Sequence, residues 1–460
     1  MSGNRAIRVA TTGVRVLTGT VVAAACVAGT VLAISAPWPT VAHEPAQAEV
    51  TPLPGDTVLV CNGDFRALGR DTADPLSMGS AGSPRITVGD ADGSPETTTL
   101  AVDDLAGAGE VRRLTGVVTD RVAPLLGATE SIQLAEDDLS GFAAAPCREA
   151  GTESWLVGGS VQTGTEDLVV LTNPGAVPAT VTLGVYGSIR ATSTSIVPAG
   201  AQIALPLTSI ASGAGTPIIK VTSTGAPVRA VLQSSLTRTL DPVGIDLQDA
   251  VSGPQKQPVI PAVQLFPSEG DDFSAAVIRL FSPGADTSAT VTVSPVGDSA
   301  TASSFTVDLA ADEPLEMALS ELDPGRYNVF VDADAPVLAA VREQDGSGPG
   351  SDFAWVMPAP EFAGRALVAV PAGPAPTIVL VNDEAADASV TISGADGGDA
   401  TEVAVPAGSS VSVDLRARAS YVVEASGPVH ASVAMTGEGA LAVWPVWPPV
   451  GAEKSITVYP

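Results

Sequence analysis

The chain has 460 residues, which is too many for one hydrophobic core and indicates three or four modules. Hydrophobic residues make up 45% of it, aromatic residues only 4% and charged residues 16%. With 46 Gly and 38 Pro, this composition favours short strands and turns over long helices. A formal net charge of −29 excludes the basic surface that nucleic-acid binding requires, and we interpret the acidity as solubilising surface charge.

The N-terminus has the pattern of a membrane-inserted segment. Residues 1–15 contain Arg5, Arg8 and Arg15 and no acid, and residues 16–36 contain no charge. An apolar helix of this length covers about 30 Å, the thickness of the hydrocarbon core of a bilayer, and basic flanks stay in the cytoplasm. We therefore predict a cytoplasmic basic segment at 1–15 and a transmembrane signal anchor at 16–36. The protein would be a single-pass protein of the cytoplasmic membrane with its N-terminus inside and its bulk extracellular.

Two alternatives to a retained anchor stay open. A peptidase could cleave at the small-residue site Ala46-Gln47-Ala48, although it lies rather far beyond the apolar run, and Pro37 opposes cleavage after Ala36. Cys26 follows three alanines and has a loose likeness to a lipoprotein cleavage site. The apolar run continues past it, however, so a cysteine buried in lipid is the favoured interpretation.

Two different regions follow the anchor. Residues 37–55 are rich in Pro, Ala and Glu and are predicted to form an extended tether. Residues 56–150 are predicted to form a separate β module, in which 111–126 is ambiguous between strand and helix. Cys61 and Cys147 lie at its start and end. In an oxidising compartment this even count predicts a disulfide, with two reduced thiols as the alternative.

The rest of the chain repeats itself. Stretches that begin at Leu168, Ala276 and Thr377 each contain an apolar strand, a tight polar turn and a second, alternating strand, which predicts a β-hairpin in each copy. Each copy also ends with a strand that begins at Pro-Val, and the period is about a hundred residues.

Six or seven short strands per copy favour a sandwich over a propeller blade, which has about four strands in 40–50 residues. The sequence thus predicts an all-β chain after one N-terminal transmembrane helix. Its tandem immunoglobulin-like antiparallel β-sandwich units would occupy residues 151–262, 263–358 and 359–460.

The residues around this repeat resemble a known family. The runs 141–147 and 154–159 and the Leu-Thr-Asn-Pro-Gly turn at 171–175 are similar to those of domain-of-unknown-function family 5719, a family of actinobacterial envelope proteins. The resemblance covers most of the external chain, and the turns at 282–283 and 382–383 depart from its Asn-Pro pattern. It implies a signal anchor, immunoglobulin-like sandwiches and gene proximity to cell-surface glycosyltransferases. It assigns no activity and no functional residue.

The sequence offers no recognisable catalytic constellation. His43 lies in the tether and His430 alternates along a strand, and neither has a partner nearby in the sequence. No nucleophile elbow, phosphate-binding loop or paired-cysteine motif occurs. A hydrolase with two carboxylates is an alternative because acids are abundant, but nothing singles out a pair. We predict a protein that is not an enzyme, with no catalytic, cofactor-binding or metal-binding residues and no cofactor.

Two acidic turns are the best candidates for a bound ion. The turns at Asp90 to Ser94 and at Asp332 to Asp334 each place two acids two residues apart, as in part of a calcium loop. The remaining calcium ligands are missing from both, so a solvated hairpin turn is favoured.

Four tryptophans are candidates either for packing or for stacking on a glycan: Trp155, Trp355, Trp444 and Trp447. They lie near the ends of the repeats in apolar stretches, which favours packing in cores or between modules. A carbohydrate-binding module would require at least one of them on an exposed sheet face.

The leading functional interpretation is a non-catalytic scaffold or interaction protein displayed outside the cytoplasmic membrane. Its predicted partners are the membrane, through residues 16–36, and envelope proteins or wall glycan. Two alternatives are an accessory subunit of a membrane glycosyltransferase or wall-polymer pathway, and a carbohydrate-binding module. Fold class alone does not separate the three.

Overall fold

The structure, a computed structural model, describes residues 3–35, 47–50, 54–74, 77–91, 93–106, 109–267, 276–319, 322–449 and 456–458. The chain divides into two compact units. One contains the two terminal segments, Met1–Pro52 and Lys454–Pro460, and the other is the body, Leu53–Glu453. The described residues are mostly strand, with one long helix at the N-terminus, so the predicted all-β class with one N-terminal helix is confirmed. The immunoglobulin-like assignment and the domain bounds stay predictions.

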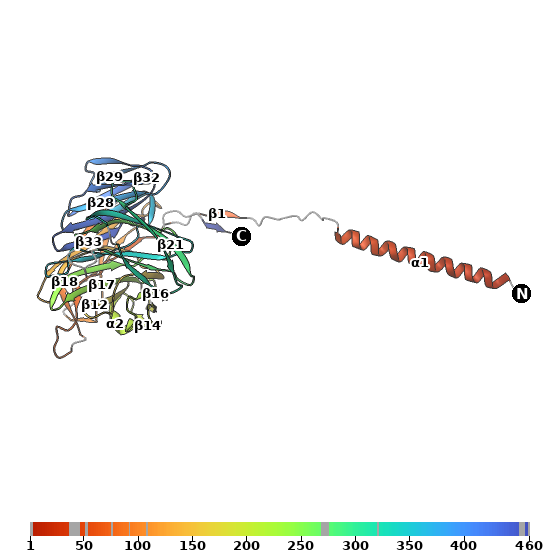
Figure 1. Ribbon diagram of the computed structural model, residues 1–460, viewed down its shortest axis with the longest axis horizontal. Coiled ribbons are helices and arrows are strands. Elements are labelled where there is room, and N and C mark those ends of the chain that lie inside the picture. The colour runs from red at the N-terminus through yellow and green to blue at the C-terminus, as the bar shows by residue number, and fades with distance from the viewer. Residues whose placement is uncertain are drawn as a thin grey trace. The chain divides into compact units, whose positions relative to one another are not determined.

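The terminal unit contains the apolar helix α1 (Gly3–Ser35), drawn in red in Figure 1. Its segment Gly13–Ser35 is long and apolar enough to cross a membrane, which agrees with the predicted anchor and supports membrane attachment. The hydroxyls of Thr18 and Thr20 donate to carbonyls four residues earlier, so these polar groups are satisfied within the helix. Cys26 is exposed on it.

The same unit contains a sheet that the sequence did not predict. Within the predicted tether, β1 (Ala48–Val50) pairs antiparallel with β34 (Ile456–Val458) near the C-terminus. Each strand has three residues, which is too short for an alternation pattern to be recognised in the sequence.

The body consists of four groups of strands, which we call the first to fourth modules (57–147, 153–249, 259–356 and 361–445). The first module contains β2 (Thr57–Val60), β3 (Phe65–Ala67), β4 (Met78–Gly82), β5 (Arg85–Asp90), β6 (Glu96–Leu100), β7 (Leu105–Ala106), β8 (Val111–Gly116), β9 (Leu126–Ala135) and β10 (Ser140–Cys147). The second contains β11 (Glu153–Leu156), β12 (Thr165–Asn173), β13 (Ala179–Tyr186), β14 (Ala191–Val197), β15 (Ala201–Pro206), the short helix α2 (Leu207–Ala211), β16 (Ile218–Thr224), β17 (Arg229–Arg238) and β18 (Asp241–Asp249).

The third module contains β19 (Val259–Leu265), β20 (Ala276–Phe281), β21 (Thr287–Pro295), β22 (Ser303–Leu309), β23 (Leu315–Ala318), β24 (Gly325–Ala333), β25 (Leu338–Gln344) and β26 (Phe353–Val356). The fourth contains β27 (Glu361–Val370), β28 (Pro376–Asn382), β29 (Ala388–Gly394), β30 (Ala400–Val405), β31 (Ser409–Asp414), β32 (Ala419–Gly437) and β33 (Ala440–Pro445).

The second and third modules have the same topology. Each has two four-stranded sheets, ordered β11-β16-β13-β14 and β15-β12-β17-β18 in the second module, and β19-β24-β21-β22 and β23-β20-β25-β26 in the third. The fourth module keeps this order, but its 19-residue strand β32 runs through both sheets and takes two places. Alternation along strands such as β13, where every second residue is buried, places Val181 and Leu183 in the core between the sheets.

The first module is a fourth copy of this topology. Its sheets β2-β8-β6 and β10-β9-β5 correspond in order and antiparallel pairing to β11-β16-β13 and β18-β17-β12. Sequence comparison did not detect this copy, because the small sheet β3-β4-β7 interrupts it. The ambiguous stretch 111–126 forms strand β8 followed by a loop.

The three predicted hairpins are wrong. The two strands of each predicted pair lie in different sheets: β12 and β13, β20 and β21, and β28 and β29 are not neighbours. The observed hairpins join β13 to β14 and β17 to β18, with equivalents in the later modules. Alternation identifies a strand and its buried face but not the strand that it pairs with, and a short polar turn can connect two sheets as well as two neighbouring strands.

A buried polar side chain holds each of these connections between sheets, and in two of the three it is an asparagine. Asn173, with no exposed surface, donates from Nδ2 to the carbonyls of Val177, Val197 and Pro198 and accepts from the amide of Gly175. These bonds tie the turn after β12 to the end of β14.

The later modules have the same arrangement. Asn382 donates to the carbonyls of Ala386 and Val405 and accepts from the Glu384 amide, whereas Ser282 makes one equivalent bond to Ala285. The Asn-Pro turn that marks the first copy in the sequence is thus a structural connector.

Replacing Asn382 by alanine is expected to lower the free energy of unfolding by about 3 kcal/mol, because three hydrogen bonds are lost and the buried carbonyl of Val405 is left without its partner. Urea unfolding of the intact protein in detergent micelles measures this. The Asn382→Ser variant, which copies the third module, should lose clearly less. Equal stability of Asn382→Ala and the parent protein would contradict this role.

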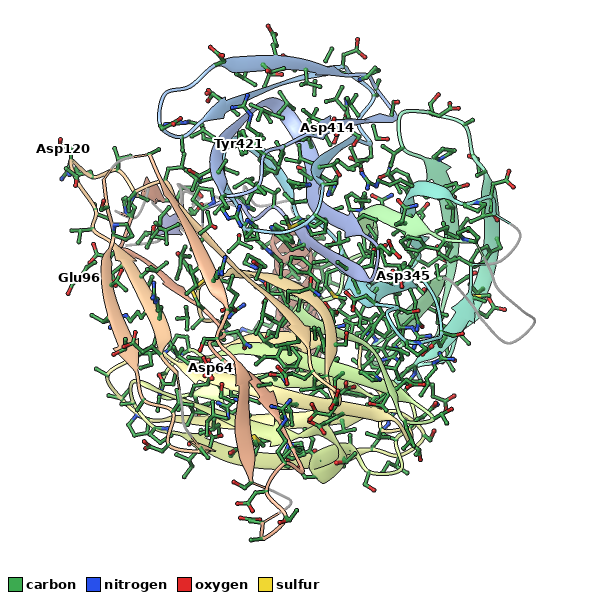
Figure 2. All side chains as sticks on the ribbon, turned by 90° about the vertical axis from the view of Figure 1, so that its left-hand side faces the viewer. Asp64, Glu96, Asp120, Asp345, Asp414 and Tyr421 are labelled. Carbon is green, nitrogen blue, oxygen red and sulfur yellow. A yellow bond between two sulfur atoms is a disulfide. The ribbon has the colours of Figure 1, made fainter. Side chains whose placement is uncertain are left out.

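The four modules close into a ring. Their last strands contact each other in a cycle: β10 contacts β18, β18 contacts β26, β26 contacts β33, and β33 contacts β10. Figure 2 shows the modules around a common centre, with the first in orange, the second in yellow and green, the third in blue-green and the fourth in blue. The body is therefore a single compact unit in which each module packs against two others. The sequence, read as tandem units, did not predict that its ends meet.

One carboxylate lies where the four last strands meet. Asp352 accepts hydrogen bonds from the backbone amides of Phe142 (2.9 Å), Ile245 (3.1 Å) and Leu441 (2.9 Å), which belong to the other three modules. It has no exposed surface, and burial raises its pKa well above the ordinary value although these amides favour the charged form. Asp345, labelled in Figure 2, accepts from the Asp352 amide at 2.7 Å.

Glycines make room for this carboxylate. Gly141 and Gly244 precede two of the donating residues with φ of +140° and +132°. A Cβ atom added at either would lie 2.5 Å or 2.8 Å from Oδ1 of Asp352. The close approach of these strands to the centre therefore requires glycine at both positions.

The predicted disulfide between Cys61 and Cys147 is confirmed. It joins the residue after β2 to the end of β10, closes a loop of 86 residues in sequence, and is buried. On chain-entropy grounds a loop of this length contributes up to about 4 kcal/mol. A Cys61→Ala/Cys147→Ala variant should therefore unfold at lower urea concentration than the oxidised protein. Its urea midpoint should equal that of the parent protein whose disulfide has been reduced. A midpoint equal to that of the oxidised parent protein would contradict the prediction.

Candidate functional site

A cavity of about 250 Å³ lies between the first, second and fourth modules, and two others in the body have about 60 and 70 Å³. Its walls contain apolar residues, including Leu126, Leu367 and Trp444, and a group of charged and aromatic side chains. Both buried and exposed residues line it, so it opens to the surface near Gly151 and Glu153.

The polar side chains of the cavity lie at the ends of strands that meet in the ring. Arg148 directly follows β10, and Asp249 is the last residue of β18. Arg229 begins β17, and Trp447 follows β33. The backbone of Arg148 exchanges two hydrogen bonds with Val60, next to the disulfide, which fixes the position of its side chain.

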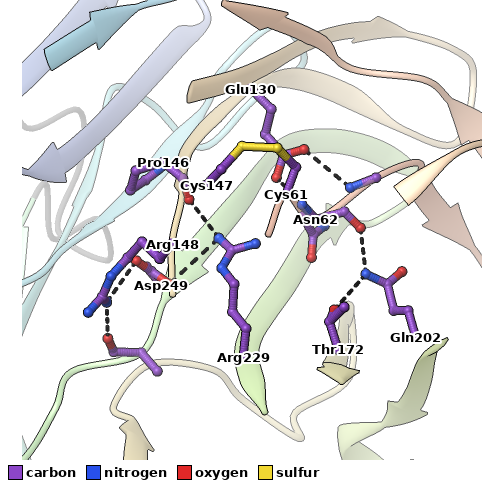
Figure 3. A network of polar contacts seen from close by, with 12 residues as sticks. Cys61, Asn62, Glu130, Pro146, Cys147, Arg148, Thr172, Gln202, Arg229 and Asp249 are labelled. Carbon is purple, nitrogen blue, oxygen red and sulfur yellow. Dashed lines mark hydrogen bonds and ion pairs between the residues drawn. A yellow bond between two sulfur atoms is a disulfide. The ribbon is translucent and has the colours of Figure 1, made fainter. Parts of the chain in front are cut away.

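Figure 3 shows the polar contacts of Arg148 and Arg229 with Asp249. Nη1 of Arg148 donates to Oδ2 of Asp249 and to the carbonyl of Ala250, both at 2.9 Å. Nη2 of Arg229 donates to the carbonyl of Pro146 at 2.7 Å and lies 3.7 Å from Oδ1 of Asp249. Two guanidinium groups thus share one carboxylate.

An aromatic ring completes this group. The Arg148 guanidinium lies over the ring of Trp447, 3.3 Å from its centroid. Arg229 and Asp249 are almost fully buried, whereas the Arg148 side chain is 18% exposed. Arg148 is therefore both fixed in orientation and accessible from the cavity.

Electrostatics differ among the acids around the cavity. Burial raises the pKa of Glu149, and Arg148 opposes this. Behind Arg229, burial raises the pKa of Glu130 to about 7, although Arg229 and the amides of Asn62 and Gly63 favour its charged form. Glu130 therefore keeps its proton to a higher pH than an exposed glutamate does.

A polar network anchors the wall on this side. Glu130 accepts a hydrogen bond from the backbone N–H of Asn62 at 2.6 Å. Nε2 of Gln202 donates to the backbone carbonyl of Asn62 at 2.8 Å and to the hydroxyl of Thr172 at 2.9 Å (Figure 3). Gln202 and Thr172 belong to the second module, so this network joins it to the first across their interface.

The smaller cavity of about 70 Å³, between the second and third modules, contains a similar combination. The guanidinium of Arg279 lies 4.7 Å from the ring centroid of Trp355, and its Nε and Nη2 both donate to Glu316. In this cavity the carboxylate that the guanidinium binds is the side chain of Glu316.

The four singled-out tryptophans fall into two groups. Trp155, Trp355 and Trp444 are buried within the body, the first two in one cluster between the second and third modules. Trp447 is only partly buried and lines the large cavity. None of the three buried rings forms an exposed platform on a sheet face.

The histidine and acidic-turn candidates are distributed as follows. His430 is buried, contacts the Ala359 carbonyl at 2.8 Å and lies 3.4 Å from Asp383, which raises its pKa against the effect of burial. Asp332 and Asp334 are exposed beside a turn.

The remaining candidates fall wholly or partly outside the described residues. His43 and Asp92 lie outside them, and so the turn at 90–94 is only partly described. Within the described parts, no three His, Cys, Asp or Glu residues are grouped as metal ligands would be.

Sequence reasoning missed the charged residues of the cavity. Arg148 lies next to a cysteine that was singled out, but Asp249 and Arg229 lie far away in the sequence and meet it only when the ring closes. The available signal was Arg229 directly before the apolar run 230–232, because an Arg that becomes buried there requires a partner.

Comparison with known proteins places the chain in a family. Residues 101–416 match the family described as a family of unknown function, DUF5719, which is more than half of the chain and includes parts of all four modules. No curated protein and no solved structure shows a significant match. The chain therefore belongs to DUF5719, as its repeat and turn motifs suggested.

Proposed function

We propose that this protein is a non-catalytic binding protein of the cell envelope. In this proposal residues 16–36 anchor it in the cytoplasmic membrane, the ring lies outside, and the cavity beside Arg148 and Trp447 receives a ligand or a segment of an envelope partner. The observation that carries the proposal is the cavity itself, which combines apolar walls with a few fixed polar groups.

The chemistry of the lining suits binding. Guanidinium groups stay protonated at physiological pH and donate hydrogen bonds without exchanging protons. Asp249 is occupied by Arg148 and Arg229. These residues are suited to holding a ligand in one orientation rather than to transferring a proton to it.

A second candidate function is carbohydrate binding, favoured by the partly exposed Trp447 in the cavity wall. Amphipathic aromatic rings commonly line sugar sites because one face of a sugar is apolar. In this form the glycan would enter the cavity and not lie on a sheet face.

The test is crosslinking and affinity capture of the intact protein from its native membrane. The comparisons are a form that lacks residues 1–36 and a Trp447→Ala variant. Capture of envelope proteins or wall glycan by both the intact and the truncated form, but not by Trp447→Ala, supports the proposal. Recovery of a membrane glycosyltransferase only with the intact chain would instead favour an accessory subunit that acts through its anchor.

A further inference from the structure

We infer that the cavity binds a small ligand with a carboxylate group, about the size of a single sugar acid, and that Nε and Nη2 of Arg148 hold this carboxylate. This inference rests on the proposed function and specifies the ligand of the same site. It follows from the edge of Arg148 that the protein leaves free.

Arg148 uses only one nitrogen for its contacts with the protein. Nη1 donates to Asp249 and to the Ala250 carbonyl, and Nε and Nη2 make no hydrogen bond to a described residue. These two nitrogens carry parallel N–H groups, and this edge of a guanidinium matches the two oxygens of a carboxylate.

Two other arginines show what this edge binds in the same protein. Nε and Nη2 of Arg70 donate to the two oxygens of Asp138, each at 2.7 Å. The same two nitrogens of Arg279 donate to Glu316. Arg148 lines the cavity, and no described carboxylate of the chain takes the equivalent edge.

The free edge is preorganised. The ring of Trp447 covers one face of the guanidinium, and the bonds to Asp249 and to the Ala250 carbonyl fix its rotation. Two backbone hydrogen bonds with Val60 fix the main chain of Arg148. Little side-chain entropy is left to lose when a ligand binds, which raises affinity.

The balance of charge leaves room for one anion. Arg148 and Arg229 share the single carboxylate of Asp249, while Glu153 at the rim is paired with Lys220 at 3.0 Å. Glu149 also lines the cavity, but burial raises its pKa, so its negative charge is disfavoured there. Glu130 lies behind Arg229, but burial raises its pKa to about 7, which weakens its compensation of that guanidinium. A ligand carboxylate at Arg148 would complete the compensation of the two guanidinium groups.

Unpartnered donors point to the same kind of ligand. Nε and Nη1 of Arg229 and Nε1 of Trp447 are buried and have no hydrogen-bond partner among the described residues. Cavity residues thus offer donors in excess of acceptors, and a ligand rich in acceptors complements them. A volume of about 250 Å³ lies just below the range for drug-sized ligands, which suits a single sugar acid.

The experiment titrates the intact protein in detergent micelles with glucuronate, with glucose and with acetate, and follows the indole N–H signal of Trp447 by NMR. A Trp447→Phe variant assigns that signal. Glucuronate is expected to shift it with saturation, glucose should bind at least tenfold more weakly, and acetate should compete with glucuronate.

Arg148→Lys keeps the positive charge but cannot donate two parallel hydrogen bonds to one carboxylate, so it should weaken glucuronate binding at least tenfold. Arg70→Lys removes a similar surface edge far from the cavity and should change nothing. Equal binding of glucose and glucuronate, or unchanged affinity in Arg148→Lys, would overturn the inference.

The outcomes separate this inference from the proposed function. If envelope partners are captured through Trp447 but glucuronate does not bind through Arg148, the site is right and the ligand class is wrong. If Trp447→Ala captures the same partners as the parent protein, the proposed function itself fails, whatever the titration shows.

Discussion

Replacement of Asp352 by alanine is expected to lower the free energy of unfolding by about 3–9 kcal/mol, the largest effect of any single substitution considered. The carboxylate accepts from the amides of Phe142, Ile245 and Leu441, and each buried amide left without a partner costs about 1–3 kcal/mol. Domains have a total stability of about 5–15 kcal/mol, so the variant should be close to unfolding. Urea unfolding of the intact protein, followed by tryptophan fluorescence, measures the loss.

Two controls make this prediction specific. Asp352→Asn keeps one carbonyl oxygen as an acceptor but places an NH₂ group against an amide donor, so it should be intermediate in stability. Asp334→Ala removes an exposed acid from a turn and should change the stability by less than about 0.5 kcal/mol. If Asp352→Ala were as stable as Asp334→Ala, the centre of the ring would not depend on this carboxylate.

The second large effect is a loss of stability as the pH rises. Burial raises the pKa of Asp167 to about 6, of Asp246 to about 7 and of Glu343 to about 8, and the charges of neighbouring acids add to all three shifts. Glu130, with a pKa of about 7, behaves in the same way. These acids hold protons in the folded protein at pH values where the unfolded chain has released them.

The sign follows from proton counts. Below about pH 4 both states hold the protons, and these four groups impose no penalty. Between about pH 4 and 8 the folded state binds more protons than the unfolded state, so the free energy of unfolding falls as the pH rises. Above about pH 8 this fall levels off. A shift of three pKa units corresponds to an upper limit of about 4 kcal/mol per group, and we expect a total loss of at least about 4 kcal/mol between pH 5 and 8.5.

Unfolding midpoints of the intact protein at pH 5, 7 and 8.5 test this prediction, and one variant isolates the cause. Glu343 accepts from the Gln264 amide at 2.7 Å, and glutamine at this position keeps an acceptor but does not ionise. Glu343→Gln should be more stable than the parent protein at pH 8.5 and should depend less on pH. A parent protein that is equally stable at pH 5 and 8.5 would contradict the prediction.

The sequence predicted the local features of the fold and missed its closure. The apolar run up to residue 35, the alternation in strands such as β13 and the spacing of Cys61 and Cys147 each have a local physical cause, and the structure agrees with them. Strand pairing does not have a local cause. The turns at Asn173 and Asn382 look like hairpin turns in the sequence, but they connect two sheets through bonds to distant carbonyls.

The candidate site was even less predictable. Trp447 was singled out as one of four tryptophans, and only the packing of modules distinguishes it from Trp155 and Trp355, which are buried. Arg148 and Asp249 lie about a hundred residues apart in the sequence and meet because the last strands of neighbouring modules contact each other. Without an alignment, no signal in one sequence pairs residues at that distance.

The cycle of contacts among β10, β18, β26 and β33 fixes the number of modules. In an open array, evolution can add or delete one repeat and change only the length, because each repeat contacts only its neighbours. In this body a lost module would expose the apolar edges of two others, and an added one would prevent the amides of Phe142, Ile245 and Leu441 from reaching one carboxylate together. Descendants of this chain should therefore vary in loops and in the sheet β3-β4-β7 while the count of four stays constant.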